Sequence, residues 1–429
     1  MRILVVGSGG REHALAWKLA AEPGVGEVVC APGNAGIAAV ARLADVSAAD
    51  PERLAELAAR ERIDLTVVGP ELPLDRGLAD VFHARGLRVF GPSRDAAQLE
   101  CSKVFAKAFM TRHGIPTARY RICDSSAAAH AIVASGELGW PLVVKADGLA
   151  AGKGVVVAPD RSVADQAIDD AMEARRFGEA GSRLVLEECL EGPEVSCFAV
   201  CDGRRAMPLG SAQDHKRVFD GDRGPNTGGM GAFAPSPLVD DALAERVRRE
   251  IVERVLEGMR ADGMEYRGFL YAGLMITRDG PTVIEFNVRF GDPEAQVVVP
   301  SIEGELAPIL AAAADGAVGA FPLTLRSDKH VGVVVASQGY PGTSRPGLPI
   351  AGLRDAEALG DVLVFHSGTA AGPRGEPVTA GGRVLTVVGR GATFEAAIGR
   401  AYSGVACIRF DGMQYRRDIG QKAVKTAGA

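Results

Sequence analysis

Short apolar runs alternate with helical patterns over the first hundred residues. The runs RILVVGS, EVVCAPG, DLTVVGP and RVFGP read as strands, and helical patterns at 11–21 and 52–60 separate them. Strands that alternate with helices are typical of a parallel sheet whose two faces are both covered. We therefore predict an N-terminal α/β domain with a parallel sheet over residues 1–102.

The pattern changes after a helical stretch at 95–113 and the breaker Gly114-Ile115-Pro116. The runs WPLVVKADG, GKGVVVAP and SRLVLEECL predict a small α+β unit at about 120–187. The runs EVSCFAVCDG, FLYAGLMITRDG and PTVIEFNVRF predict a larger, mostly antiparallel sheet. Short strands between Gly and Pro turns, followed by an alanine-rich helix, indicate a last region from about Ser327. The expected fold is multidomain α/β and α+β, divided into residues 1–102, 103–326 and 327–429.

Composition and charge exclude some classes of function. The 429 residues are 47% hydrophobic and 24% charged, which is ordinary for a folded globular protein. A formal net charge of -6 argues against a broad nucleic-acid-binding surface. The N-terminus lacks the features of a signal peptide, and no apolar stretch is long enough to span a bilayer. Seven dispersed cysteines without a Cys-x-x-Cys pair read as reduced thiols, so we expect a cytoplasmic protein.

The turn Gly7-Ser8-Gly9-Gly10-Arg11-Glu12 follows a strand and opens a helix. Backbone N–H groups and the helix dipole can receive an anion at such a turn. The dinucleotide-binding fingerprint fails here, because Glu12 stands where a glycine belongs and no acidic residue follows the second strand at Ala31-Pro32-Gly33-Asn34. Two interpretations stay open: a site for a phosphorylated substrate, and a tight turn needed for helix–strand packing.

Two further glycine-rich stretches attract attention. Residues 147–154 look like a P-loop, but Gly148 is one residue too close to Gly152-Lys153, and Gly154 replaces the Ser or Thr that holds magnesium. A hairpin loop whose backbone and Lys153 meet phosphates is one alternative, and a plain flexible hairpin is the other. The stretch 224–232 is either an anion-binding loop or a mobile surface loop.

Polar and apolar residues alternate in the run PTVIEFNVRF. Strand periodicity predicts two faces, with Thr282, Ile284, Phe286, Val288 and Phe290 on one and Val283, Glu285, Asn287 and Arg289 on the other. Two oxygen donors and a guanidinium on one face fit a magnesium–phosphate centre, although alternation alone also produces a half-solvated strand. Lys145 ends an apolar strand, where a lysine needs an anion or solvent. Other candidates for the same centre, each alone more often a solvated carboxylate, are Glu187, Glu188 and Glu194.

Together these motifs resemble the ATP-grasp superfamily, and within it the glycinamide ribonucleotide synthetases. The resemblance covers nearly the whole chain, through GSGGREHA, APGN, GPE, SKVFAKAF, KADGLAAGKGV, SAQDHKRV, GPNTGGMGA, EFNVRFGDPEAQ, GYPG, VFHSGT, GGRVLTV and RRDIG. It implies an N-terminal substrate domain, an ATP-grasp core with a mobile lid, and a small C-terminal α+β domain.

The resemblance also implies roles for individual residues. ATP would contact residues of the core and lid, namely Lys103, Lys145, Gly152, Lys153, Gly154, Glu187, Glu188, Cys189, Leu190 and, at the ribose, Glu194. The metal, Mg2+ or Mn2+, would be held by Glu285 and Asn287. The substrates would divide between phosphoribosylamine at Gly9, Gly10, Arg11 and Glu71, and glycine or its acyl phosphate at Asp214, Gly228 and Gly229. Arg289 would also bind substrate, and catalysis would involve Arg289, Lys153 and Asp214.

The implied reaction joins glycine to 5-phosphoribosylamine with ATP, as in de novo purine biosynthesis. The carboxylate of glycine would attack the γ-phosphate of ATP, and the amine would then displace phosphate from glycyl phosphate. Closure of the lid loop with Lys153 would exclude water. We expect no nucleic-acid or membrane partner, and a monomer or weak oligomer. Another ATP-grasp ligase with a different acid or amine is the main alternative, and a catalytically silent nucleotide-binding regulator ranks below it.

Overall fold

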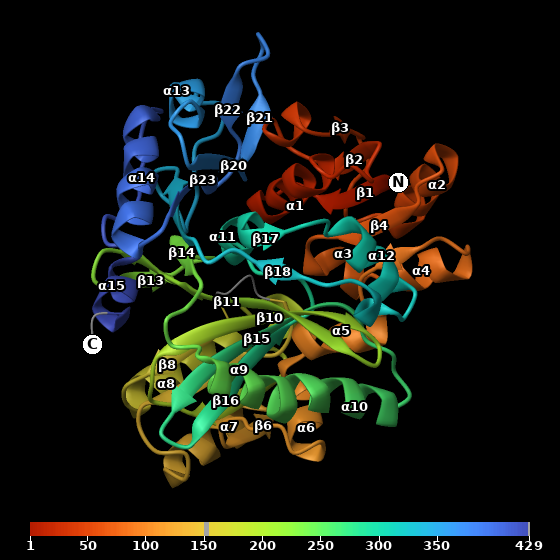
Figure 1. The fold of residues 1–429 in the computed structure, drawn as a ribbon. Helices are drawn as coiled ribbons and strands as arrows, with labels where there is room; N and C mark the ends of the chain where they lie inside the picture. Colours follow the sequence, from red (N-terminus) through yellow and green to blue (C-terminus); the bar gives the residue numbers. More distant parts are fainter. Residues whose placement is uncertain (150–153, 428–429) are drawn as a thin grey trace.

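The computed structural model describes residues 1–149 and 154–427. Its N-terminal elements are β1 (Arg2–Gly7), α1 (Gly10–Ala20), β2 (Glu27–Pro32), η1 (Ile37–Ala39), β3 (Arg42–Leu43), α2 (Pro51–Glu61), β4 (Leu65–Val68), α3 (Glu71–Asp75), α4 (Leu78–Ala84) and β5 (Val89–Phe90). They form a five-stranded sheet of order β3-β2-β1-β4-β5 in which every pairing is parallel (Figure 1). The parallel sheet predicted from the alternating pattern is therefore confirmed.

A small sheet follows two helices in the middle of the chain. The elements here are α5 (Arg94–Cys101), α6 (Lys103–Arg112), β6 (Tyr120–Cys123), α7 (Ser126–Ser135), β7 (Leu142–Ala146), β8 (Val155–Ala158), α8 (Arg161–Ile168), η2 (Asp169–Glu173), η3 (Gly178–Gly181) and β9 (Leu184–Glu188). Ser102 divides the predicted helical stretch, because its hydroxyl caps α6 by accepting from Phe105 N at 3.1 Å. The four strands, of order β6-β9-β7-β8, form what we call the lid sheet. An apolar cluster packs α7 and α8 against one of its faces.

An eight-stranded sheet forms the centre of the molecule. Its strands are β10 (Glu194–Asp202), β11 (Ala206–Asp214), β14 (Gly231–Ala234), β15 (Arg267–Thr277), β16 (Gly280–Asn287), β19 (Lys329–Ala336), β20 (Val362–His366) and β23 (Arg383–Gly391). They pair antiparallel in the order β16-β15-β10-β11-β14-β19-β23-β20. The antiparallel sheet predicted for the middle region thus continues into the C-terminal region across the predicted boundary at 327. The division into three domains stays a prediction.

Helices cover both faces of this large sheet. The remaining helices are α9 (Asp241–Val247), η4 (Arg248–Val252), α10 (Glu253–Ala261), α11 (Glu294–Val298), η5 (Val299–Ser301), α12 (Ala307–Ala314), η6 (Val318–Ala320), α13 (Leu353–Glu357), α14 (Phe394–Cys407) and α15 (Gln421–Ala427). Three strand pairs complete the fold: β12 (Arg217–Phe219) with β13 (Arg223–Asn226), β17 (Ile302–Glu303) with β18 (Thr324–Leu325), and β21 (Thr369–Ala371) with β22 (Pro377–Thr379). One apolar cluster packs α9 and α10 on the sheet, and another packs α1, α11 and α12. No helix in the described ranges is long and apolar enough to cross a membrane.

The strand β16 departs from the simple alternation predicted for it. Its pairing with β15 shifts register at Ile284, which is the extra residue of a β-bulge. Val283 therefore packs in the core beneath the sheet, whereas Ile284 is half-buried. The strand ends at Asn287, so Phe290 joins a different apolar cluster. The predicted faces are wrong at Thr282, Val283, Ile284 and Phe290, while Glu285 and Asn287 still share one face.

Candidate active site

One face of the lid sheet looks onto the large sheet. Lys145 on β7 lies opposite Val155 on β8, so the two side chains point to the same face. Glu187 on β9 shares this face, because it lies opposite Val143, two residues before Lys145. Lys145 Nζ donates to the carbonyl of Ile284 on β16 at 3.2 Å. The face that α7 and α8 leave uncovered is therefore directed toward β16.

Two lysines hold a buried carboxylate between the two sheets. Glu187 is 3% exposed, and its carboxylate lies 3.0 Å from both Lys107 Nζ and Lys145 Nζ. Lys107 Nζ also donates to Thr117 Oγ1 at 2.7 Å. Burial lowers the pKa of Lys107 to about 8, against the attraction of Glu187. Lys107 was not among the predicted site residues, although it lies one turn after Lys103 on α6 and so on the same side of that helix.

The beginning of the glycine-rich lid loop is tied to the start of α6. Lys103 Nζ donates to the carbonyl of Gly148 at 3.0 Å. Asp147 accepts from Ser102 Oγ at 3.0 Å and from Val104 N at 3.2 Å. Burial lowers the pKa of Lys103, because it removes water from around the ammonium group. A nearby anion would stabilise the charged form.

The loop itself joins two paired strands, as the hairpin interpretation requires. Strands β7 and β8 pair antiparallel, and the carbonyl of Gly154 accepts from Ala146 N at 2.8 Å to continue the ladder. The hairpin is therefore confirmed. The predicted phosphate-binding residues Gly152 and Lys153 lie outside the described residues.

The link from β9 to β10 carries the residues predicted to border adenine. Cys189 and Leu190 are half-buried in this link. The Glu188 side chain lies opposite Leu142 on the helix-covered face of the lid sheet, and its Oε2 is 2.7 Å from Arg119 Nε. Its carboxylate is thus directed away from Lys145, and only its backbone is placed to meet a base on the other face.

The large sheet presents acidic side chains on the face that meets the lid. The registers of β16, β15, β10 and β11 put Glu285, Glu194 and Asp214 on one face, with Asn287 two residues after Glu285. Lys216 lies among them, since its Nζ is 2.9 Å from Glu194 Oε2. The structure therefore brings Glu285 and Asn287, predicted to bind the metal, together with Glu194, predicted for the ribose, and Asp214, predicted for the glycine substrate. Lys216, which was not predicted, lies in the same group.

Opposing charges set the protonation of these carboxylates. Burial acts to raise the pKa of Glu285, but four cations outweigh burial and hold that pKa below its ordinary value. The cations are Lys216, Lys145, Lys103 and Arg289. Burial raises the pKa of Asp214 to about 7, even though Lys216 opposes the rise. At neutral pH Glu285 is therefore an anion, and Asp214 can exchange a proton.

The donor set on this face fits a hard divalent cation. Glu285 and Asn287 offer carboxylate and amide oxygens, which Mg2+ prefers. Over residues 1–149 and 154–427, the Glu285 carboxylate accepts no hydrogen bond that would compete with a cation. The same ranges contain no group of three His, Cys, Asp or Glu side chains able to hold a metal. A cation here would therefore complete its shell with phosphate and water oxygens, as Mg2+ commonly does.

The predicted N-terminal turn lies against the segment that follows β16. Arg11 Nη1 donates to the carbonyl of Phe290, three residues beyond β16, at 3.1 Å. Gly10 leaves no room for a side chain, since an added Cβ would lie 2.4 Å from Gln296 Nε2. Glu12 accepts from Gly9 N at 2.5 Å. The Glu12 carboxylate therefore already accepts a hydrogen bond from one N–H group of the turn, that of Gly9. Close packing explains why the turn has a glycine at position 10.

Arg289 connects the N-terminal region to the large sheet. Its Nε lies 3.3 Å from Glu71 Oε2, and its Nη2 lies 3.1 Å from Glu100 Oε1. Nη2 also donates to Asn287 Oδ1 at 3.3 Å. Burial raises the pKa of Glu100 to about 7, against the pull of Arg289. Glu71, Asn287 and Arg289 belong to the predicted site, whereas Glu100, which lies on α5 outside the motifs of the resemblance, was not predicted.

The loop containing Gly228 and Gly229 is held by the C-terminal region. Gly228 N donates to the Tyr340 hydroxyl at 2.9 Å, and its carbonyl accepts from Arg383 Nη1 at 2.6 Å. Arg383 Nη1 lies 3.2 Å from Asp292 Oδ1 as well. Gly229 has a φ of 105°, which L side chains rarely adopt. Tyr340 and Arg383 thus bring the C-terminal region to the site; both lie in motifs of the resemblance, GYPG and GGRVLTV, but neither had been given a role.

A lysine-bearing lid sheet that faces a carboxylate-bearing antiparallel sheet defines an ATP-grasp ligase. Three family models match the chain: the phosphoribosylglycinamide synthetase N domain at 1–100, its ATP-grasp (A) domain at 101–295, and its C domain at 330–422. The chain therefore belongs to the phosphoribosylglycinamide synthetase family.

Relatives and solved structures agree with this assignment. The chain is 52% identical over 427 residues to the phosphoribosylamine–glycine ligase of Ralstonia nicotianae, covering 99% of this chain and 100% of that protein. The crystal structure of phosphoribosylamine–glycine ligase from Thermotoga maritima has a TM-score of 0.84 and 34% identity, covering 97% and 100% of the two chains. The biotin carboxylase domain of a Hydrogenobacter thermophilus 2-oxoglutarate carboxylase, solved with MgADP, has a TM-score of 0.74 and 16% identity over 96% of this chain and 91% of that one, a likeness of fold alone.

Proposed function

We propose that this protein ligates glycine to 5-phosphoribosylamine with ATP, forming glycinamide ribonucleotide, ADP and phosphate. The observation that carries the proposal is a convergence: a lid lysine, the N-terminal turn and Glu71 all contact strand β16 or the segment that follows it. Whole-length relatives named for this activity support it. The alternative is another ATP-grasp ligase with a different acid or amine.

The chemistry proceeds in two transfers. A carboxylate oxygen of glycine attacks the γ-phosphorus of ATP, so that ADP leaves and glycyl phosphate forms. The amine of phosphoribosylamine then attacks the acyl carbon, the C–O bond to phosphate breaks, and the amine loses a proton. The protein contributes positioning and charge neutralisation rather than a covalent intermediate of its own.

We assign ATP to residues of the lid sheet, of the start of α6 and of the first strand of the large sheet that follows the lid. Lys103 and Lys145 contact phosphates, Lys145 from the uncovered lid face and Lys103 from the start of α6. The buried Glu187 and the backbone of the following link border the adenine, and Glu194 meets the ribose. Glu285 and Asn287 hold Mg2+ or Mn2+, which when bound supplies charge neutralisation to the phosphates.

The two other substrates lie on either side of Arg289. Phosphoribosylamine is placed by Arg11 and Glu71, next to the Gly9-Gly10 turn, and Arg289 receives negative charge there. Glycine is placed by Asp214 and by the loop at Gly228 and Gly229. Arg289 Nε lies 3.3 Å from Glu71 Oε2, so two of the residues proposed for phosphoribosylamine lie side by side.

Product identification tests the proposal. The full chain is incubated with ATP, Mg2+, glycine and phosphoribosylamine, and products are separated and weighed by mass spectrometry. We expect glycinamide ribonucleotide and ADP, and we expect phosphate release to need glycine. A product built from another amino acid, with glycine inactive, would assign the alternative ligase. We further expect a cytoplasmic enzyme that is a monomer or a weak oligomer.

A further inference from the structure

The segment between Lys216 and Thr227 leaves the active site as an exposed hairpin. It contains β12 and β13, and Val218 is the one buried side chain among residues 217–226. At its base, Thr227 N donates to the carbonyl of Lys216 at 2.8 Å. The loop with Gly229 follows at once, since Gly229 N donates to Thr227 Oγ1 at 3.0 Å. A hairpin with so little apolar burial needs other contacts to hold one position.

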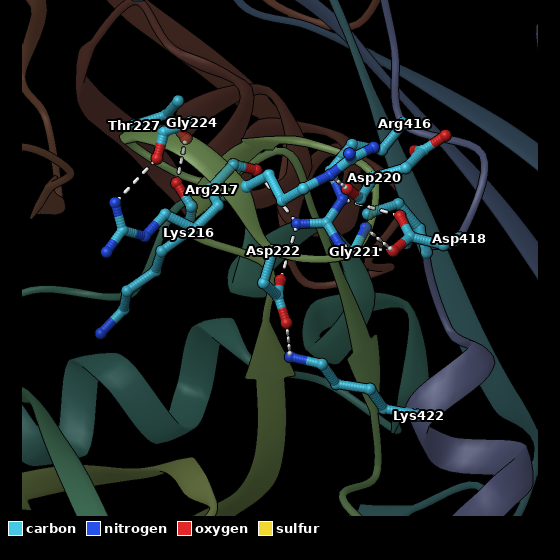
Figure 2. Close-up of polar contacts among 12 residues, drawn as sticks. Lys216, Arg217, Asp220, Gly221, Asp222, Gly224, Thr227, Arg416, Asp418 and Lys422 are labelled. Carbon is cyan, nitrogen blue, oxygen red and sulfur yellow. Dashed lines mark hydrogen bonds and ion pairs between the residues drawn. The ribbon is translucent and has the colours of Figure 1, made fainter.

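The end of the chain supplies those contacts through Arg416, as Figure 2 shows. The Arg416 side chain is 1% exposed, although it belongs to a region that follows the hairpin by almost two hundred residues. Its Nη1 donates to Asp222 Oδ1 at 2.8 Å and to the carbonyl of Arg217 at 3.0 Å. Its Nε and Nη2 each donate to a different oxygen of Asp418 at 2.7 Å. All three guanidinium nitrogens therefore donate hydrogen bonds, and two of these four bonds go to the hairpin.

Neighbouring groups fasten the turn of the same hairpin. Gly221 N donates to Asp418 Oδ2 at 2.9 Å, and Arg417 N donates to Asp220 Oδ1 at 2.8 Å. Lys422 Nζ lies 2.7 Å from the second oxygen of Asp222. Burial acts to raise the pKa of Asp418, but hydrogen bonds from Arg416 outweigh it and hold that pKa well below its ordinary value. Asp418 therefore stays an anion at neutral pH.

We infer that Arg416 is a positioning residue for the ligase reaction. It fixes the hairpin at the carbonyl of Arg217, which is three residues after Asp214, the residue proposed to hold glycine. Through the hairpin it also sets where the loop at Gly228 and Gly229 begins. The inference rests on the proposed function, in which Asp214 and this loop hold glycine. Arg416 therefore acts on glycine through the hairpin, without touching it.

The test compares Arg416→Gln with Arg416→Lys and with the exposed neighbour Arg417→Gln as matched control. Steady-state rates are measured with glycine or ATP varied, and tryptic cleavage of the hairpin is timed for the folded proteins. We expect Arg416→Gln to lower kcat/KM for glycine about tenfold or more, with the KM for ATP changed less than about twofold. Cleavage after Arg223 should be faster. Arg416→Lys should recover part of the loss, and Arg417→Gln should match wild type.

Asp222→Asn keeps the inference falsifiable if Arg416→Gln does not fold, because Asp222 lies on the exposed hairpin. It should show the same selective loss toward glycine, in smaller measure. Unchanged glycine kinetics in folded Asp222→Asn and Arg416→Lys would overturn the inference, as would equal losses toward glycine and ATP. Wild-type protein that makes no glycinamide ribonucleotide would instead refute the proposed function. The cleavage comparison would then still report whether Arg416 holds the hairpin.

Discussion

Glu285→Gln removes a charge from the centre of the site while it preserves the size of the side chain. Two opposing terms decide its effect on stability: attraction to four cations is lost, and the desolvation of a carboxylate is relieved. No hydrogen bond to this carboxylate within the described residues is lost. We therefore expect the free energy of unfolding to change by no more than about 1 kcal/mol.

The effect on turnover should be far larger. Glu285 is the charged member of the proposed metal pair, so its loss weakens stabilisation of the transferring phosphoryl group. The loss of one such electrostatic contact costs about 3 kcal/mol, or roughly a hundredfold in kcat/KM. ADP formation is followed at increasing Mg2+ with glycine and phosphoribosylamine saturating, and urea unfolding is measured on the same protein. Glu257→Gln, an exposed carboxylate on α10, serves as control.

Two results would refute this reasoning. One is a folded Glu285→Gln enzyme whose activity and magnesium dependence match the Glu257→Gln control. The other is a loss of activity that follows a loss of folded protein, because Glu285 would then be a structural carboxylate. Asn287→Leu should behave as Glu285→Gln does, since its amide oxygen accepts only from Arg289, at 3.3 Å, within the described residues.

Three other outcomes follow from the structure. Lys107→Met leaves buried Glu187 with one lysine, so urea unfolding should show a loss of about 3 kcal/mol; an unchanged midpoint would contradict the buried pair. Arg289→Lys cannot reach both carboxylates in a fork, so KM for phosphoribosylamine should rise about tenfold while ATP binding holds. Hydrogen bonds to Asp165 and Asp169 raise the pKa of His130 above its unfolded value, so their stabilisation is complete at acidic pH and is lost as pH rises through the folded pKa. Melting temperatures of wild type and His130→Gln should therefore differ at pH 5.5 and converge at pH 9.

Local patterns predicted much of the fold. The parallel N-terminal sheet follows from strands that alternate with helices along the first hundred residues, and the lid hairpin follows from two β-rich runs around a glycine-rich loop. The bulge at Ile284 escaped prediction, because an extra residue is defined only by its pairing with β15. The continuity of the large sheet escaped as well, because it depends on the pairing of β14 with β19 across the predicted domain boundary.

Residues of the candidate site could be predicted where several polar groups lie close together in one short stretch of sequence. Glu285 and Asn287 could be selected because two oxygen donors share a strand face. Lys107, by contrast, lies in the motif SKVFAKAF one turn after Lys103, but its partner Glu187 is on another element, so the sequence alone did not assign it a role. Tyr340 and Arg383 reach the glycine-rich loop only after the C-terminal strands join the sheet. Such contacts between distant segments are set by tertiary packing, which sequence spacing does not encode.

Transfer of oxygen from glycine to phosphate tests most directly the claim that ATP activates a carboxylate. Glycine labelled with 18O in both carboxylate oxygens is turned over with ATP, Mg2+ and phosphoribosylamine, and the inorganic phosphate is analysed by mass spectrometry. We expect ADP, glycinamide ribonucleotide and phosphate that carries one 18O atom, because the attacking oxygen leaves with the phosphoryl group. Unlabelled phosphate, or AMP with pyrophosphate in place of ADP, would contradict it.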